Sequence, residues 1–123
     1  MGQYYKIVNQ TKKEYLHPHK FDTGFKLLEW LGTDIVSIAL PLLLVNSNGR
    51  GGGDINEESL QDSGILGSWA GDNIVISGDY NEETDKGYVD WEDLEYYTDI
   101  SDKLLNYITK LKTNYTWLEE GNN

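Results

Sequence analysis

The chain has 123 residues, enough for one domain with a modest core and too few for a separate catalytic domain. It has no cysteine, which excludes disulfides and thiolate metal sites, and its longest apolar run, residues 35–45, is too short to cross a bilayer. The net charge of −11 disfavours direct binding to nucleic acid. We therefore expect a soluble, cytoplasmic protein of a host cell that does not bind a membrane.

The N-terminal residues are predicted to form a β-hairpin. Residues 3–8 combine aromatic and β-branched side chains, residues 9–13 are polar, and residues 14–17 return as a second short strand. Pro18 ends this strand or holds it at a sheet edge.

His17 and His19 are the only histidines of the chain. In an extended backbone they project from the same face, where two imidazoles can bind one divalent ion, zinc above all. Zinc would need further ligands, and without cysteine these must be carboxylates or water. Asp72 and Asp79 are the chosen candidates, with Asp22 and Asp54 also open. The alternative is that both histidines are ordinary polar residues beside a turn.

Two helices are predicted next. The first covers residues 21–31, is capped by Asp22 or Thr23 and ends at Gly32. Its apolar stripe at helical spacing is Phe21, Phe25, Leu28 and Leu31 or Trp30. The second, residues 34–44, is apolar nearly all round, which predicts a central core helix, kinked or broken at Pro41.

Residues 46–54 contain four glycines and are predicted to form a mobile loop. Such a loop with Arg50 could cradle a phosphate, but it lacks the strand-to-helix setting and the lysine of a P-loop. A flexible connector or a partner-contact loop is the other interpretation.

Residues 73–77 are predicted to form a strand bounded by glycine-containing turns. Ile74 and Ile76 point to one face and Val75 to the other, and this two-sided apolar pattern predicts a strand in the interior of a sheet. Trp69, just before it, either packs at the core edge or serves as an interface hot spot.

Most of the negative charge follows the glycine-rich loop. Residues 34–100 carry fifteen of the twenty-one acidic residues, against only Arg50 and Lys86. Acidic and aromatic residues alternate over 81–99, which are predicted to form a hairpin or a helix–strand connection with a strand near 95–98. We expect one coherent anionic patch that meets a basic partner; solubility alone is the other explanation. The expected contact residues are Asp54, Glu57, Glu58, Asp62, Glu82, Glu83, Asp85, Asp90, Trp91, Glu92, Asp93 and Glu95.

The last predicted helix is capped by Ser101. Leu104, Leu105, Ile108 and Leu111 form its apolar stripe. Residues 1–118 are expected to form one domain and residues 119–123 a disordered tail.

Several motifs carry a resemblance over residues 1–80. The motifs Met1-Gly2-Gln3-Tyr4-Tyr5-Lys6, His17-Pro18-His19-Lys20-Phe21, 49–54 (GRGGGD), 67–72 (GSWAGD) and 78–80 (GDY) resemble a family of small phage and mobile-element proteins. The size, charge and histidine pair also resemble small acidic anti-CRISPR proteins, some of which bind a metal ion. That second resemblance implies that the target is a CRISPR effector nuclease, whose nucleic-acid channels are basic.

Together these observations predict an α+β domain, with a small, mainly antiparallel sheet and two to three helices on one face. We expect a binding protein rather than an enzyme: an inhibitor that blocks a basic nucleic-acid-binding surface of a host effector nuclease and holds a structural metal. The alternative is a metal-dependent hydrolase of a phosphoester or nucleotide, built on the histidine pair and a carboxylate.

Overall fold

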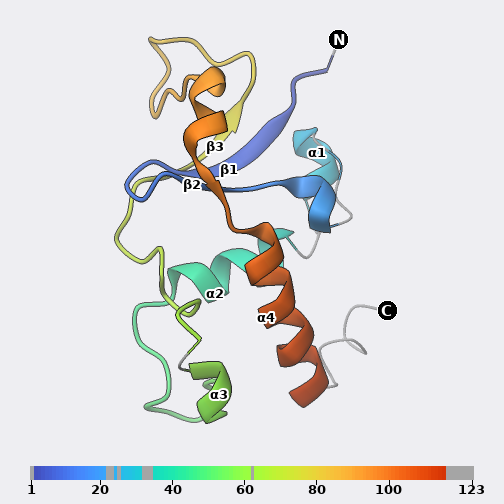
Figure 1. Cartoon of the computed structure of the whole chain (residues 1–123), viewed down its shortest axis with the longest axis vertical. Helices are drawn as coiled ribbons and strands as arrows, with labels where there is room; N and C mark the ends of the chain where they lie inside the picture. The colour runs from blue at the N-terminus through green and yellow to red at the C-terminus, as the bar shows by residue number, and fades with distance from the viewer. Residues whose placement is uncertain (1, 22–23, 25, 32–34, 62, 116–123) are drawn as a thin grey trace.

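The computed structural model describes residues 2–21, 24, 26–31, 35–61 and 63–115, and these form the predicted α+β fold (Figure 1). The strands are β1 (Tyr5–Asn9), β2 (Glu14–Leu16), β3 (Ile74–Gly78) and β4 (Thr98–Asp99), in the sheet order β3-β1-β2-β4. The α-helices are α1 (Leu27–Trp30), α2 (Leu40–Leu44), α3 (Glu58–Gln61) and α4 (Ser101–Asn114). Shorter helical segments are η1 (Pro18–Phe21), η2 (Ile35–Ala39) and η3 (Trp91–Tyr96).

The predicted N-terminal hairpin is confirmed. Strands β1 and β2 pair antiparallel with Ile7 opposite Leu16 and Val8 opposite Tyr15. Lys13 in the turn has a φ of 59°, a left-handed conformation that closes the connection. Because side chains alternate along a strand, Ile7 and Leu16 lie on one face of the sheet and Val8 and Tyr15 on the other.

Strand β3 lies at an edge of the sheet, so the prediction of an interior strand is wrong. It pairs with β1 alone among the described strands, in a register that sets Ile7 opposite Ile76 and Val8 opposite Val75. Its two apolar faces have another cause. Ile74 packs against the main core, while Val75 is covered on the opposite face by a segment that does not belong to the sheet.

The secondary structure of residues 91–99 also differs from the prediction. A strand was expected near 95–98, but Trp91–Tyr96 form the 3-10 helix η3, whose start is capped by the Asp90 side chain accepting from the Glu92 N–H at 3.0 Å. The strand that follows, β4, has two residues and runs parallel to β2. The sheet is therefore mixed, with two antiparallel pairings and one parallel pairing.

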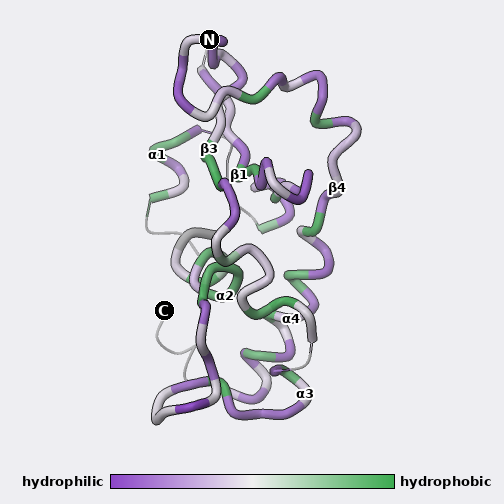
Figure 2. The backbone as a smooth tube through the Cα atoms, turned by 90° about the vertical axis from the view of Figure 1, so that its left-hand side faces the viewer, coloured by the Kyte–Doolittle hydropathy of each residue, from purple (hydrophilic) through white to green (hydrophobic). Residues whose placement is uncertain are grey.

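The main core lies between the Ile7 face of the sheet and the helices. Figure 2 shows α2 as mostly hydrophobic and α4 as alternating. Fully buried members of this core are Ile7, Leu16, Trp30, Ala39, Leu43, Leu60, Trp69 and Leu104. Trp69 is 0% exposed, and its Nε1 donates to Glu14 Oε1 at 2.8 Å, so it is a core residue and no surface hot spot.

The first predicted helix is much shorter than expected. The described helical residues are η1 and α1, and Asp22, Thr23, Phe25 and Gly32 lie outside the described residues. Leu28 is 81% exposed and Leu31 is 65% exposed, whereas Trp30 is 1% exposed and donates through Nε1 to Gly24 O. Of the two predicted alternatives for the stripe, Trp30 is therefore the core residue.

The second predicted helix is interrupted as Pro41 requires. Residues 35–39 form a wider π-helical turn, η2, and α2 continues from Leu40. Proline has no N–H to donate and its ring excludes the carbonyl four residues earlier, so a regular α-helical ladder cannot run through this point. The last carbonyls of α2 are satisfied from outside: Leu42 O accepts from Gly67 N and Leu43 O from Trp69 N.

Helix α4 confirms the predicted C-terminal helix, but the prediction that Ser101 caps it is wrong. Ser101 is its first helical residue, and its Oγ accepts from His17 N rather than from an N–H of the helix. Of the predicted stripe, Leu105 is only half-buried. Leu104, Ile108 and Leu111 are buried, together with Tyr107, which the leucine pattern missed. Residues 116–123, including the predicted tail, lie outside the described residues. Within the described chain, none of the helices has both the length and the apolar character needed to cross a bilayer.

Candidate functional site

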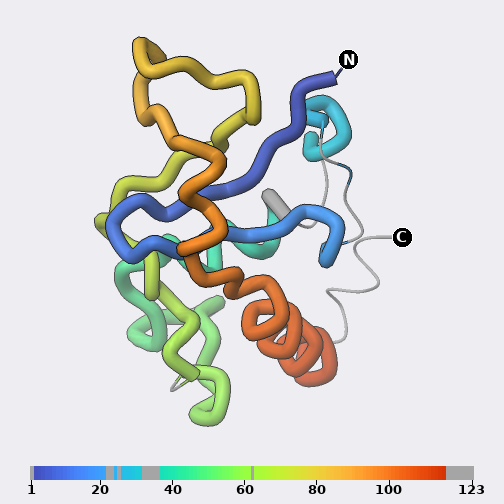
Figure 3. The backbone as a smooth tube through the Cα atoms, turned by 45° about the horizontal axis from the view of Figure 1, so that its top comes forward, coloured from blue at the N-terminus to red at the C-terminus, as the bar shows by residue number. Residues whose placement is uncertain are grey.

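Residues 79–97, which we name the acidic cover, fold back over the Val8 face of the sheet. Figure 3 shows this yellow-to-orange segment returning across the blue strands β1 and β2. Val89 and Leu94 are only 3% and 5% exposed and pack with Val8, and Tyr15, Val75 and Trp91 pack around them. The cover is thus attached by a second, smaller hydrophobic core.

Hydrogen bonds close the loop at the start of the acidic cover. Asn81 Nδ2 donates to Val89 O at 3.0 Å, and Val89 N donates back to Asn81 Oδ1 at 2.8 Å. Gln10 Nε2, in the β1–β2 turn, donates to Tyr88 O at 3.0 Å. The loop is therefore joined to itself and to the hairpin by polar contacts as well as by packing.

Trp91, predicted as a partner contact, faces inward as an anchor. Its Nε1 donates to Ser77 Oγ at 3.1 Å, and the Lys6 ammonium lies 5.1 Å from its ring centre and 5.0 Å from that of Tyr15. Burial lowers the pKa of Lys6, while Asp99 opposes that change. The exposed aromatic residues of the cover are instead Tyr80, at 55%, and Tyr96, at 79%, neither of which is in the predicted contact set, although Tyr96 belongs to the acidic and aromatic stretch on which that set is based.

Seven predicted contact residues lie exposed on the cover, and we name them the cover carboxylates. They are Glu82, Glu83, Asp85, Asp90, Glu92, Asp93 and Glu95. Within the described part of the chain, no lysine or arginine forms an ion pair with any of the seven. Their charge therefore faces solvent, and Lys86 is the only basic residue in this stretch of the sequence.

Tyr88 reports the combined field of these carboxylates. Burial raises the pKa of the Tyr88 hydroxyl, and the negative charges of Asp90, Glu83, Asp93 and Glu92 raise it further. Two of these acids precede η3 and two belong to it, so the loop before η3 and the helix itself both affect the Tyr88 hydroxyl. Four of the seven cover carboxylates thus raise the pKa of the same side chain, Tyr88.

The remaining predicted contact residues do not join this surface. Glu57 and Glu58 are exposed beside and on α3, which Figure 1 places at the opposite end of the molecule from the cover. Asp62 lies outside the described residues. The prediction of one continuous patch from the glycine-rich loop onward is therefore wrong, because the core and α2 separate the two acidic regions.

The Asp54 side chain accepts hydrogen bonds within the glycine-rich loop, so it is not available as a partner contact. Its Oδ2 accepts from the backbone N–H groups of Gly49, Arg50 and Gly51 at 2.9, 3.1 and 3.1 Å. Asn48 and Ile55 close the loop with reciprocal side-chain-to-backbone bonds. The loop is therefore closed by hydrogen bonds, and its convergent N–H groups already hold an anion of the chain itself in place of a phosphate.

The predicted metal ligands are not brought together. Asp72 and Asp79 flank opposite ends of β3, roughly 20 Å apart for an extended chain. Asp72 accepts from Asn9 Nδ2 and pairs with Lys12, and Asp79 Oδ1 accepts from Tyr4 N. His17 and His19 do lie together, with ring centres 5.9 Å apart. Within the described residues, no three His, Asp or Glu side chains gather as metal ligands.

Among the described residues, the carboxylates linked to the region of the histidine pair are Asp99 and Asp102, which were not among the predicted ligands. His17 N donates to Ser101 Oγ at 2.8 Å, and Ser101 N donates to Asp99 Oδ1 at 2.9 Å. Lys20 Nζ bridges Asp99 and Asp102, at 3.0 and 3.4 Å. Burial lowers the pKa of His17, with Lys6 adding to this and Asp99 opposing it. These contacts join β2 and β4 to the start of α4.

Comparison with known proteins found no matching family model, no matching curated protein and no matching solved structure. Function is therefore inferred from the geometry and charge of the acidic cover.

Proposed function

We propose that the acidic cover binds a basic protein surface that otherwise binds nucleic acid, and that this protein inhibits its partner by occupying that surface. The observation that carries the proposal is the set of seven exposed cover carboxylates, held on a segment that Val89 and Leu94 anchor to the sheet. Attachment matters because a preorganised surface loses less conformational entropy on binding than a disordered acidic tail would.

The composition of the cover supports a protein groove as the partner. Tyr80 and Tyr96 add exposed aromatic surface beside the carboxylates, and tyrosine is enriched at protein interfaces. Carboxylates spaced along a folded segment are complementary to lysine and arginine side chains arranged to bind phosphates. The resemblance described above implies a CRISPR effector nuclease of the host as the partner, and blocked loading of nucleic acid as the effect.

A structural metal is left out of this proposal. Its four expected ligands lie at three separate places, and Asp72 already pairs with Lys12. No contact in the described structure favours the alternative of a metal-dependent hydrolase over the binding function.

The proposal is tested by capture with matched charge variants. The protein is immobilised and exposed to host lysate at low salt, as the wild type, as Glu92→Gln/Asp93→Asn, and as Glu57→Gln/Glu58→Gln. Both variants lose two adjacent exposed acidic residues, but only the first pair lies on the cover. We expect the first variant to lose the partner and the second to retain it.

A second step tests the inhibitory part. The captured partner is purified, and its binding to nucleic acid is followed by gel mobility with increasing wild-type protein. Displacement of the nucleic acid is the expected result. Equal loss of partner in both variants, or a partner that binds nucleic acid and this protein together, contradicts the proposal.

A further inference from the structure

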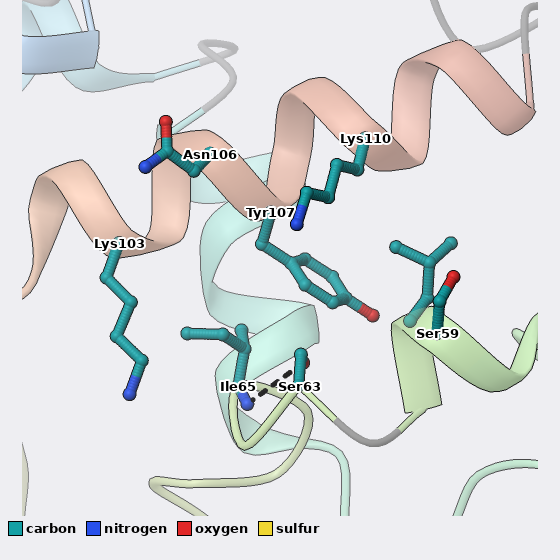
Figure 4. Close-up of a pocket in the computed structure, with 8 residues that line it drawn as sticks. Ser59, Ser63, Ile65, Lys103, Asn106, Tyr107 and Lys110 are labelled. Atoms are coloured by element: carbon teal, nitrogen blue, oxygen red, sulfur yellow. Dashed lines mark hydrogen bonds between the residues drawn. The ribbon is translucent and has the colours of Figure 1, made fainter.

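A small pocket between α3 and α4 is lined by basic and neutral side chains, in contrast to the acidic cover. It encloses about 200 Å³ and is lined by Ser59, Leu60, Ser63, Ile65, Lys103, Asn106, Tyr107 and Lys110. Figure 4 shows α4 along one side and the chain from α3 to Ile65 along the other. The pocket contains two lysines and no acidic side chain among its described lining residues.

The donors of the pocket come from both of its sides. Lys103, Tyr107 and Lys110 are three and four residues apart on α4, so they share one face of the helix. Ser59 and Ser63 lie across from them (Figure 4). Neither Lys103 nor Lys110 forms an ion pair within the described residues, so both ammonium groups are available to a ligand.

Tyr107 supplies an independent indication that the pocket takes a polar ligand. The residue is 4% exposed, and no hydrogen bond of good geometry satisfies its hydroxyl within the described residues; Ser63 is the one side chain whose hydrogen-bonding effect reaches it. A buried hydroxyl without a partner is costly in free energy, and Figure 4 shows this one directed into the pocket toward Ser59. The neighbouring Ser63 Oγ accepts from Ile65 N at 3.2 Å, and the same hydroxyl also acts on Tyr107.

Tyr107 keeps its proton at neutral pH and so stays a donor. Burial raises the pKa of Tyr107 to about 12, Tyr115 adds to the rise, and Ser63 opposes it. A phenol in this state donates to an anion and does not repel it. Two ammonium groups, a phenol and serine hydroxyls suit an acceptor with several oxygen atoms.

We propose that this pocket binds a phosphate group, either as free phosphate or as the phosphate of a small monoester. Its volume lies below that of pockets for drug-sized ligands, typically about 300–1,000 Å³, and suits a group of the size of a phosphate. Leu60 and Ile65 form an apolar wall beside the donors, where the carbon part of a monoester would pack. The site is separate from the acidic cover and does not depend on the function proposed for it.

The test is a titration of the isotope-labelled protein followed by NMR, with inorganic phosphate and phenyl phosphate as probes and chloride at matched ionic strength as the reference. We expect saturable shifts confined to amides near Ser59, Ile65, Lys103, Tyr107 and Lys110. If only inorganic phosphate saturates the pocket, the ligand is free phosphate. If phenyl phosphate binds more tightly, the ligand is a monoester whose carbon part packs on the apolar wall.

Amino-acid substitutions distinguish a specific phosphate site from nonspecific attraction of the anion to exposed lysines. Lys110→Gln should weaken binding about tenfold. Lys103→Gln/Lys110→Gln should abolish saturation. Tyr107→Phe, which keeps the ring and removes only the hydroxyl, should weaken binding severalfold. Lys86→Gln removes the same charge from the acidic cover and should change nothing. Shifts that never saturate with either probe, or that persist in the double variant, overturn the proposal.

Discussion

Individual carboxylates of this chain fall into two groups according to what they contact. Asp54, Asp72 and Asp99 accept hydrogen bonds from backbone N–H groups, asparagine or lysine, and their pKa values are lowered below the usual carboxyl value. For Asp54 and Asp72 these bonds are the largest influence; for Asp99 they outweigh an opposing effect of burial. Glu92, Asp93 and Glu95 belong to the other group, exposed on η3 without an ion pair to described residues.

Asp54 gives a prediction about pH. Hydrogen bonds from Gly51, Gly49 and Arg50 lower the pKa of Asp54 below its ordinary value of 3.8. A carboxyl whose pKa is lower in the folded chain stabilises the fold above the ordinary pKa and loses that contribution as pH falls through the lowered value. Exchange protection of the three amides should therefore persist below pH 3.8 and then vanish.

The control for this prediction is Asp54→Ala, in which protection of the same amides should be lost already at neutral pH. If the three amides in the wild type lose protection at the pH where an ordinary carboxyl titrates, the convergent contact does not hold in solution.

A second prediction at this scale concerns Leu94. Because Leu94 is 5% exposed between η3 and the sheet, Leu94→Ala should lower the free energy of unfolding by about 2–3 kcal/mol. The matched change Leu28→Ala, at a residue that is 81% exposed, should alter it by less than about 0.5 kcal/mol. Urea denaturation measures both, and similar values for the two would mean that the cover is not packed on the sheet.

Among the elements, the acidic cover shows how an irregular segment is held in place. It contains only the short helix η3 as regular structure, and its attachment relies on Val89, Leu94, Trp91 and the paired bonds of Asn81. The same attachment explains why β3 is apolar on both faces although it is an edge strand.

Asn81 tests the attachment of this element. Asn81→Ala removes the donor to Val89 O and the acceptor of Val89 N, which leaves two polar groups of a buried residue unsatisfied. We expect a loss of about 1–3 kcal/mol in unfolding free energy and faster amide exchange at Val89. Asn56→Ala, at an exposed asparagine, is the control; equal effects on stability would contradict the role of the Asn81 bonds.

The elements with strong local patterns could be predicted, and those defined by distant contacts could not. The hairpin around residues 9–13 and helix α4 followed from alternation, a polar turn and a leucine stripe. Strand β4 has two residues and exists because it pairs with β2, more than eighty residues earlier in the chain, so no local pattern announces it. The edge position of β3 could not be predicted because the acidic cover buries Val75. An edge strand covered on both faces has the same apolar pattern as an interior strand.

At the scale of the whole molecule, charge is divided between separate regions. The cover carboxylates lie at one end, Glu57 and Glu58 at the other, and the lysines of α4 line a pocket beside α3 (Figure 1). The sequence located the acidic residues of the cover correctly as an exposed group. The sequence could not show that Asp54 accepts hydrogen bonds from its own loop, or that Glu57 and Glu58 lie far from the cover. Both facts depend on the three-dimensional packing of the chain.

This distribution predicts how stability responds to salt. Seven like charges on one segment repel each other, and added sodium chloride screens that repulsion more than it weakens the three ion pairs of the described residues. The melting temperature should therefore rise with salt at neutral pH. The rise should be smaller in Glu92→Gln/Asp93→Asn than in Glu57→Gln/Glu58→Gln, and a fall in the wild type would contradict a coherent anionic surface.

The proposed role of the acidic cover is tested most directly by the salt dependence of affinity for the captured partner. The dissociation constant is measured over a series of salt concentrations for the wild type and the two charge-pair variants. We predict a steep weakening with salt for the wild type and the α3 pair, and a clearly shallower slope for Glu92→Gln/Asp93→Asn. The same slope in all three proteins would show that the cover does not contact the partner.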